Sequence, residues 1–168
     1  MKTVNRICQI LAIVLGIGSV VLFFLRFATI TSSGSDVSLV GAQLGFGSKI
    51  TAAGTEYRMA KSSDILFCFL LTVLSAVFGT LSFKSKKLRY FAPAVGIIDA
   101  VYMLVIALSN PNKFVDARPL PDVTAISYTP FVLVTAIALF AFTASAVAYL
   151  LIDDYIEVKE SNGSKLTI

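Results

Sequence analysis

The chain has 168 residues, of which 57% are hydrophobic and 14% are charged, and its formal net charge is +4. A soluble domain carries about 25% charged residues, so this composition excludes an ordinary soluble domain and predicts an integral membrane protein. The positive balance does not indicate a nucleic-acid binder, because the basic residues lie in short segments beside apolar runs. We therefore expect membrane lipids as partners, and no nucleic acid.

Four apolar runs are each close to the roughly 20 residues that cross the hydrocarbon core of a bilayer. They cover residues 7–30, 65–83, 90–108 and 131–152. The connecting segments are 31–64, 84–89 and 109–130, and the tail is 153–168. Small residues recur within these runs at the spacing that lets membrane helices pack closely. We predict an all-α membrane protein, a single domain in which four transmembrane helices form an antiparallel bundle.

The first run follows two basic residues, Lys2 and Arg6, as a secretory signal would. Its apolar stretch is longer than the roughly 7–15 residues of a signal. We therefore expect a retained span rather than a cleaved leader.

The orientation follows from the short basic loop between the second and third runs. This loop contains Lys84, Lys86, Lys87 and Arg89. Dense basic segments beside a span stay in the cytoplasm, so both termini are expected there, and segments 31–64 and 109–130 are expected outside. The same four residues are predicted to form a lipid-facing cluster, because juxtamembrane basic side chains attract anionic headgroups.

The two cysteines, Cys8 and Cys68, lie near the starts of consecutive runs. Consecutive spans run in opposite directions, so the two thiols belong near opposite faces, and we predict no disulfide. The outer segments contain no cysteine and no glycosylation sequon. This favours the plasma membrane of a bacterium over an animal cell surface.

The first outer segment contains a strand-prone stretch at 36–51. β-branched and apolar residues alternate there in part, interrupted by Gly41, Gly45 and Gly47. The pattern predicts a β-hairpin-like element of one or two short strands with a glycine turn. The second outer segment holds Pro111, Pro119, Pro121 and Pro130. Its prolines favour restricted, extended backbone, and we expect no more than a short strand or turn there.

Asp99 is the one acidic residue inside an apolar run. A carboxylate in a membrane helix is costly, about 2.5–3.5 kcal/mol on insertion scales, so it is expected to have polar company. Counting to the same depth along the other runs gives Ser75, Thr143 and Ser145 as candidates for an intramembrane polar site. Two interpretations stay open: a proton or cation site, and a hydrogen-bonded aspartate that fastens the helices together.

Arg26, near the outer end of the first run, and Asp64, at the start of the second, are expected at a similar depth. They form a candidate outer-face ion pair, and Glu56 and Asp36 are alternative partners for Arg26. Such a pair either closes the bundle or contributes to an outward-facing site for an anion or a partner.

No enzyme signature is present. The chain has no histidine, no Cys-x-x-Cys, no phosphate-cradling loop and no nucleophile elbow, so no cofactor or metal is expected. The first functional hypothesis is a non-enzymatic interaction or assembly component, in which stretch 36–51 offers its backbone to a partner or to a second copy. The alternative is a small transport or channel component that uses Asp99.

The layout of four spans, a long strand-prone first outer loop and a shorter second one resembles the claudin-type tetraspan arrangement. The claudin signature in that loop, one tryptophan and two cysteines, is absent from this chain, which contains no tryptophan. The resemblance therefore implies a topology and does not imply a function.

Overall fold

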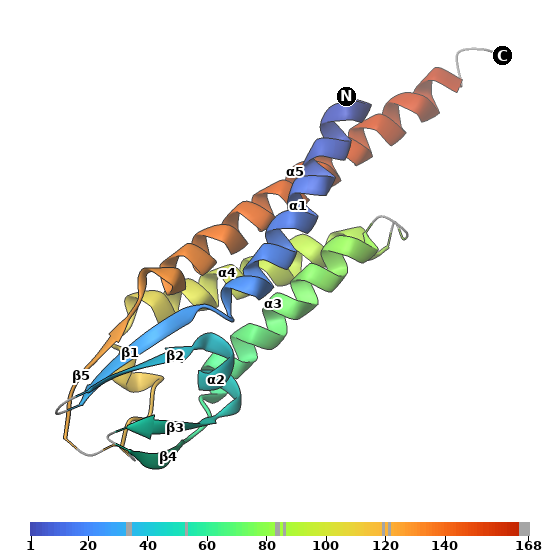
Figure 1. Cartoon of the computed structure of the whole chain (residues 1–168). Coiled ribbons are helices and arrows are strands. Elements are labelled where there is room, and N and C mark those ends of the chain that lie inside the picture. The colour runs from blue at the N-terminus through green and yellow to red at the C-terminus, as the bar shows by residue number, and fades with distance from the viewer. Residues whose placement is uncertain are drawn as a thin grey trace.

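The computed structural model describes residues 1–32, 35–52, 54–82, 85, 87–118, 120 and 122–164. This described part of the chain is mostly helical, with four long apolar helices and a smaller part made of strands (Figure 1). The long helices are α1 (Lys2–Leu22), α3 (Ser63–Leu81), α4 (Phe91–Leu108) and α5 (Pro130–Ser164). Each is long and apolar enough to cross a membrane. This confirms the prediction of four apolar helices.

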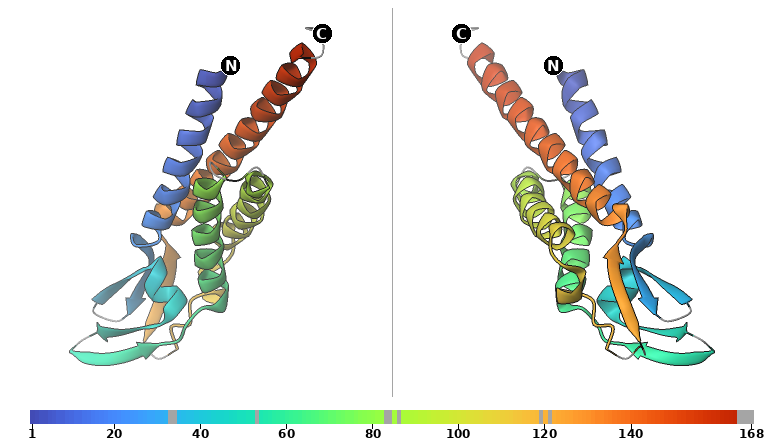
Figure 2. Two further views of the ribbon diagram at one scale, coloured as in Figure 1. Left: turned by 90° about the vertical axis from the view of Figure 1, so that its right-hand side faces the viewer. Right: turned by 90° about the vertical axis from the view of Figure 1, so that its left-hand side faces the viewer.

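Each long helix packs mainly against two of the other three. Helix α1 packs against α3 and α5, and α4 packs against the same two neighbours. Both chain termini lie at one end of the helices, here called the terminal end, while the strands gather at the other, the strand end (Figures 1 and 2). The connection between α3 and α4 also lies toward the terminal end, and a short 3-10 helix, η1 (Leu88–Tyr90), leads into α4.

Two small antiparallel sheets form the strand end. One contains β2 (Ser35–Val40), β1 (Arg26–Ser32) and β5 (Val123–Tyr128) in that order, so β1 is central. The other is the hairpin of β3 (Ser48–Ala52) and β4 (Thr55–Met59). The three-stranded sheet therefore combines strands from both outer segments: β1 and β2 come from the first half of the chain, and β5 comes from segment 109–130. A short 3-10 helix, η2 (Pro111–Lys113), precedes β5 in that segment.

The predicted first span, 7–30, is wrong over its last eight residues, 23–30. Helix α1 ends at Leu22, and the chain continues from Arg26 as strand β1. Residues 29–31 are Thr-Ile-Thr, and β-branched residues favour strands. A continuous apolar run does not by itself distinguish a helix from a buried strand.

The glycine turn predicted within 36–51 is also wrong. Gly41 and Gly45 belong to a short helix, α2 (Gly41–Phe46), and β2 pairs with β1 rather than with β3. A Cβ atom on Gly41 would come within 2.9 Å of the Phe23 and Phe27 rings, so the close approach requires glycine. Gly47 ends the helix with a φ of 77°, a conformation that favours glycine.

Helix α2 is fixed to the ends of two long helices. The N–H of Ala42 donates to the carbonyl of Phe23, just past α1, at 3.0 Å. The N–H of Ser62, the N-cap of α3, donates to the carbonyl of Leu44 at 2.8 Å. The strand end is therefore attached directly to the helices, and one buried cluster runs from Met103 and Ile106 in α4 into Ile30 of the sheet.

The fourth long helix extends into the predicted tail. Helix α5 continues past 152, where the fourth apolar run ends, to Ser164. Residues 165–168 of the predicted tail lie outside the described residues.

A single aromatic ring fills the centre of the helical part. Phe142 of α5 is fully buried, and Gly16, Gly79 and Gly96 of three other helices face its ring. A Cβ on Gly96 would come within 2.7 Å of both the ring and the Thr143 hydroxyl oxygen. Glycine at these positions lets the four helices close around Phe142.

Replacing Gly96 with alanine should therefore destabilise the protein by about 1–3 kcal/mol through overpacking. Gly18→Ala is the matched control, since nothing lies within 4 Å of a Cβ placed there. Unfolding of the purified protein in detergent measures both variants, and equal stability of the two would contradict this packing.

Candidate functional site

Asp99 is fully buried between α4 and α3. The Oγ1 atom of Thr72 lies 2.8 Å from its Oδ2 atom. The three residues predicted to share a polar site with Asp99 form no hydrogen bond with it among the described contacts. Ser75 is buried, but its hydroxyl has no hydrogen-bond partner among the described residues. Thr143 and Ser145 donate back to carbonyls of their own helix, those of Leu139 at 2.9 Å and Ala141 at 2.8 Å.

Thr72 is the partner that depth counting missed. It lies one turn before Ser75, and the buried face of α3 consists of Ile65, Cys68, Thr72, Ser75 and Gly79. This spacing of three and four residues was visible in the sequence and could have identified Thr72. Depth alone does not say which face of a helix points at its neighbour.

The hydrogen-bond geometry around Thr72 favours a protonated, neutral Asp99. Thr72 Oγ1 lies 3.0 Å from the carbonyl oxygen of Cys68 as well as 2.8 Å from Asp99, yet a hydroxyl has one hydrogen to donate. Both contacts are satisfied together when a protonated Asp99 donates to Thr72 and Thr72 donates to Cys68. No described cation forms an ion pair with Asp99, which also favours the neutral carboxylic acid.

The variant Asp99→Asn should consequently stay close to wild-type stability, because its amide N–H can donate to Thr72 as the acid does. Asp99→Ala removes the donor and leaves a cavity, and it should cost about 2 kcal/mol or more. Unfolding in detergent compares the two. An equal loss in both variants would rule out a donor role for Asp99.

The predicted ion pair between Arg26 and Asp64 does not form. Arg26 is exposed at the start of β1, because α1 ends before it and the chain carries it into the sheet. Asp64, in the first turn of α3, instead accepts a hydrogen bond from the hydroxyl of Tyr102 in α4. Tyr102 lies three residues after Asp99, so α3 and α4 are joined by two polar contacts along one face.

The prediction that Arg89 belongs to a lipid-facing cluster in the basic loop is wrong. Its side chain is only 5% exposed, and it contacts three carboxylates of α5. These are Asp153, Asp154 at 2.7 Å and Glu157 at 3.3 Å. Asn5 of α1 also donates to Asp153, at 3.1 Å. The extension of α5 past 152 supplies these acidic partners. Lys87 is exposed, and Lys84 and Lys86 lie outside the described residues.

Arg89→Gln should destabilise the protein by about 2 kcal/mol, because it leaves carboxylates of α5 without their counter-ion. Breaking a fully buried pair costs about 3–5 kcal/mol, and these carboxylates are 25–41% exposed. Arg118→Gln is the control: that pair is mostly solvent-exposed, so it should change stability far less. Unfolding in detergent measures both, and an equal effect would show that the Arg89 contacts do not hold α5 to η1.

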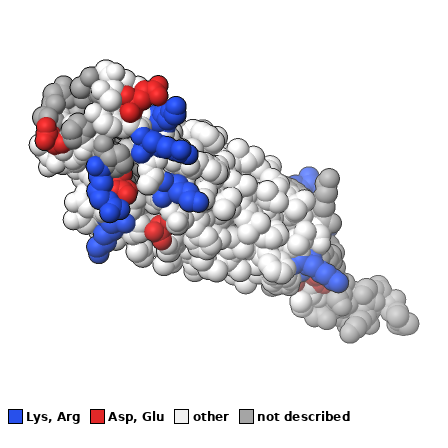
Figure 3. All heavy atoms as spheres, turned by 90° about the horizontal axis from the view of Figure 1, so that it is seen from below, with Lys and Arg blue, Asp and Glu red and all other residues white. Residues whose placement is uncertain are grey.

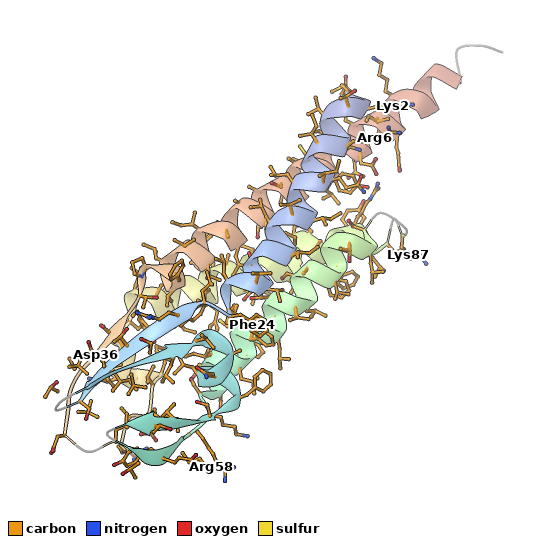
Figure 4. All side chains as sticks on the ribbon, viewed as in Figure 1. Lys2, Arg6, Phe24, Asp36, Arg58 and Lys87 are labelled. Atoms are coloured by element: carbon orange, nitrogen blue, oxygen red, sulfur yellow. The ribbon has the colours of Figure 1, made fainter. Side chains whose placement is uncertain are left out.

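Charged side chains gather at the two ends, and an uncharged belt separates them on the face shown in Figure 3. Lys2, Arg6 and Lys87 lie toward the terminal end, and Asp36 and Arg58 lie at the strand end (Figure 4).

The strand end carries two hollows. The first, the loop hollow, has a volume of about 580 Å³ and includes Lys61, Lys113 and Arg118 in its lining. Arg118 forms an ion pair with Asp116 and donates two hydrogen bonds to its carboxylate, each of 2.9 Å. The Arg118 guanidinium holds the pKa of Asp116 below its ordinary value, so this carboxylate stays charged at neutral pH and balances the arginine.

The second hollow, the hairpin hollow, has a volume of about 830 Å³ and lies beside the base of β3 and β4. Its lining is Phe46, Gly47, Ser48, Lys49, Arg58, Met59, Ala60 and Lys61. Sequence analysis did not single out these basic residues, because they become neighbours only when the hairpin forms.

Comparison with protein-family models, with curated proteins and with solved structures gave no match to this chain. The likeness to claudins therefore remains one of layout.

Proposed function

We propose that this chain is a four-span membrane protein that acts by contact, without catalysis, through its strand end. The four long helices would cross the plasma membrane of a bacterial cell as an antiparallel bundle. The positions of Lys2, Arg6 and Lys87 toward the terminal end support a cytoplasmic location for both termini (Figure 4). The strand end would then face outward.

The observation that carries a contact function is the edge strand β2. Among the described residues it has ladder pairing to β1 alone, so its other edge offers backbone donors and acceptors. Ser38, near the middle of β2, is exposed. An extended segment of a partner, or of a second copy, could add to this edge as a further strand. This proposal retains the interaction role expected for 36–51 and narrows it to β2.

The transport alternative has less support. Asp99 is fully buried and its hydrogen-bond geometry suits a neutral acid that fastens α3 to α4. An ion pathway needs polar groups that line a water-filled space. The contact function is therefore the better match to the geometry.

Photo-crosslinking in intact membranes tests the proposal. A photoreactive residue in place of Ser38 should give covalent adducts with a second copy or with one recurrent protein. The same residue at Ile98, an exposed position on α4, is the control and should react with lipid. Absence of protein adducts at Ser38, or an identical adduct pattern at the two positions, would contradict docking at β2.

A further inference from the structure

The β3–β4 hairpin has one apolar face and one charged face. Ile50 and Met59 are buried and pack into the main core. On the opposite face the register places Lys49 directly across from Arg58. Like charges at directly opposed positions of an antiparallel pair destabilise the hairpin. This arrangement therefore calls for an anion between or beside the two side chains.

The chain itself supplies little of that negative charge. Glu56 contacts Lys49 at 3.5 Å, but both side chains are largely exposed, so the pair is weak. Arg58 and Lys61 form no ion pair with any described residue. The hydroxyl of Ser48 has no hydrogen-bond partner within the described part of the chain either. All of these residues except Glu56 line the hairpin hollow.

Apolar surface adjoins this basic hollow. Phe46, which also lines it, is 59% exposed, and its ring centroid lies 5.6 Å from that of Phe69 in α3. Phe24, which is 58% exposed, lies 6.0 Å from the same ring. Helix α2, which ends at Phe46, is hydrogen-bonded to the ends of α1 and α3. The aromatic rings are thus at the level where the spans end, and exposed aromatic rings are common at that level in membrane proteins.

We propose that the hairpin hollow binds the phosphate headgroup of an anionic phospholipid in the outer leaflet. Arg58, Lys61 and Lys49 contact the phosphate, whose oxygens accept several charged hydrogen bonds. Phe46 and Phe24 contact the adjoining acyl chains. This inference rests on the membrane placement proposed above, and it is independent of docking at β2.

A headgroup suits this hollow better than a soluble anion does. A free phosphate would use the basic side chains and leave the exposed phenylalanine rings in water. The loop hollow shares Lys61, but Asp116 already neutralises its arginine. Of the two hollows, the hairpin hollow is the one that combines Arg58, which forms no ion pair with a described residue, with an exposed aromatic ring.

Native mass spectrometry of the full chain in detergent tests the proposal, with phosphatidylglycerol, phosphatidylcholine and soluble glycerol phosphate as probes. The wild type should retain one phosphatidylglycerol in preference to phosphatidylcholine. The double variant Arg58→Gln, Lys61→Gln should bind it about 30-fold more weakly, since each basic side chain near a membrane surface contributes about fivefold. Phe46→Ser should weaken lipid retention as well.

The matched control is the double variant Arg6→Gln, Lys159→Gln, which removes the same charge from exposed positions of α1 and α5. It should keep wild-type lipid retention. Equal loss in the control, no preference for phosphatidylglycerol, or equally tight binding of glycerol phosphate would each overturn the lipid site. Failure of the wild type to insert into proteoliposomes would instead overturn the membrane placement on which the proposal rests.

Discussion

The helical part of this protein depends on one contact, the insertion of Phe142 between the glycines of three neighbouring helices. Gly16, Gly79 and Gly96 each come so close to that ring that a methyl group would collide with it or press on it. These contacts bring α3 and α4 together beside the Phe142 ring. Asp99 lies one turn from Gly96 in α4, and it contacts Thr72, which lies two turns from Gly79 in α3. The buried carboxyl therefore has a partner as a consequence of glycine packing, without any cation nearby among the described ion pairs.

A second constraint joins the helices to the strands. Strand β1 follows α1 after a short turn and becomes the centre of the three-stranded sheet, so the sheet cannot move independently of the first helix. Helix α2 adds hydrogen bonds to the ends of α1 and α3. The hairpin beside α2 is consequently held at a fixed height above the helix ends. This placement brings the exposed ring of Phe46 and the basic hairpin side chains to one hollow, which supports the proposal that they bind one lipid molecule.

The sequence was sufficient for the features that depend on hydropathy and length. Four apolar helices followed from those properties. Features that depend on contacts between distant parts of the chain could not be predicted from hydropathy and length. Residues 26–30 are apolar enough for either a helix or a strand, and only pairing with β2 and β5 decides for the strand. Arg89 belonged to a basic loop in the sequence, while its acidic partners lie more than 60 positions later. Phe142 gave no signal, because its significance comes from glycines on other helices.

The partners of the ionisable side chains differ between the helical part and the strand end. Within the described residues, Asp99 is hydrogen-bonded to Thr72, Asp64 to Tyr102, and Arg89 is held by carboxylates of α5. Each of these contacts joins two helices, which is the role expected of polar groups in a medium without water. At the strand end, in contrast, Arg58 and Lys61 line an open hollow and form no ion pair with any described residue, and Lys49 faces Arg58 across the hairpin. Opposed cations destabilise a hairpin unless an anion offsets them, so they support the strand end, rather than the helical core, as the binding part that we propose.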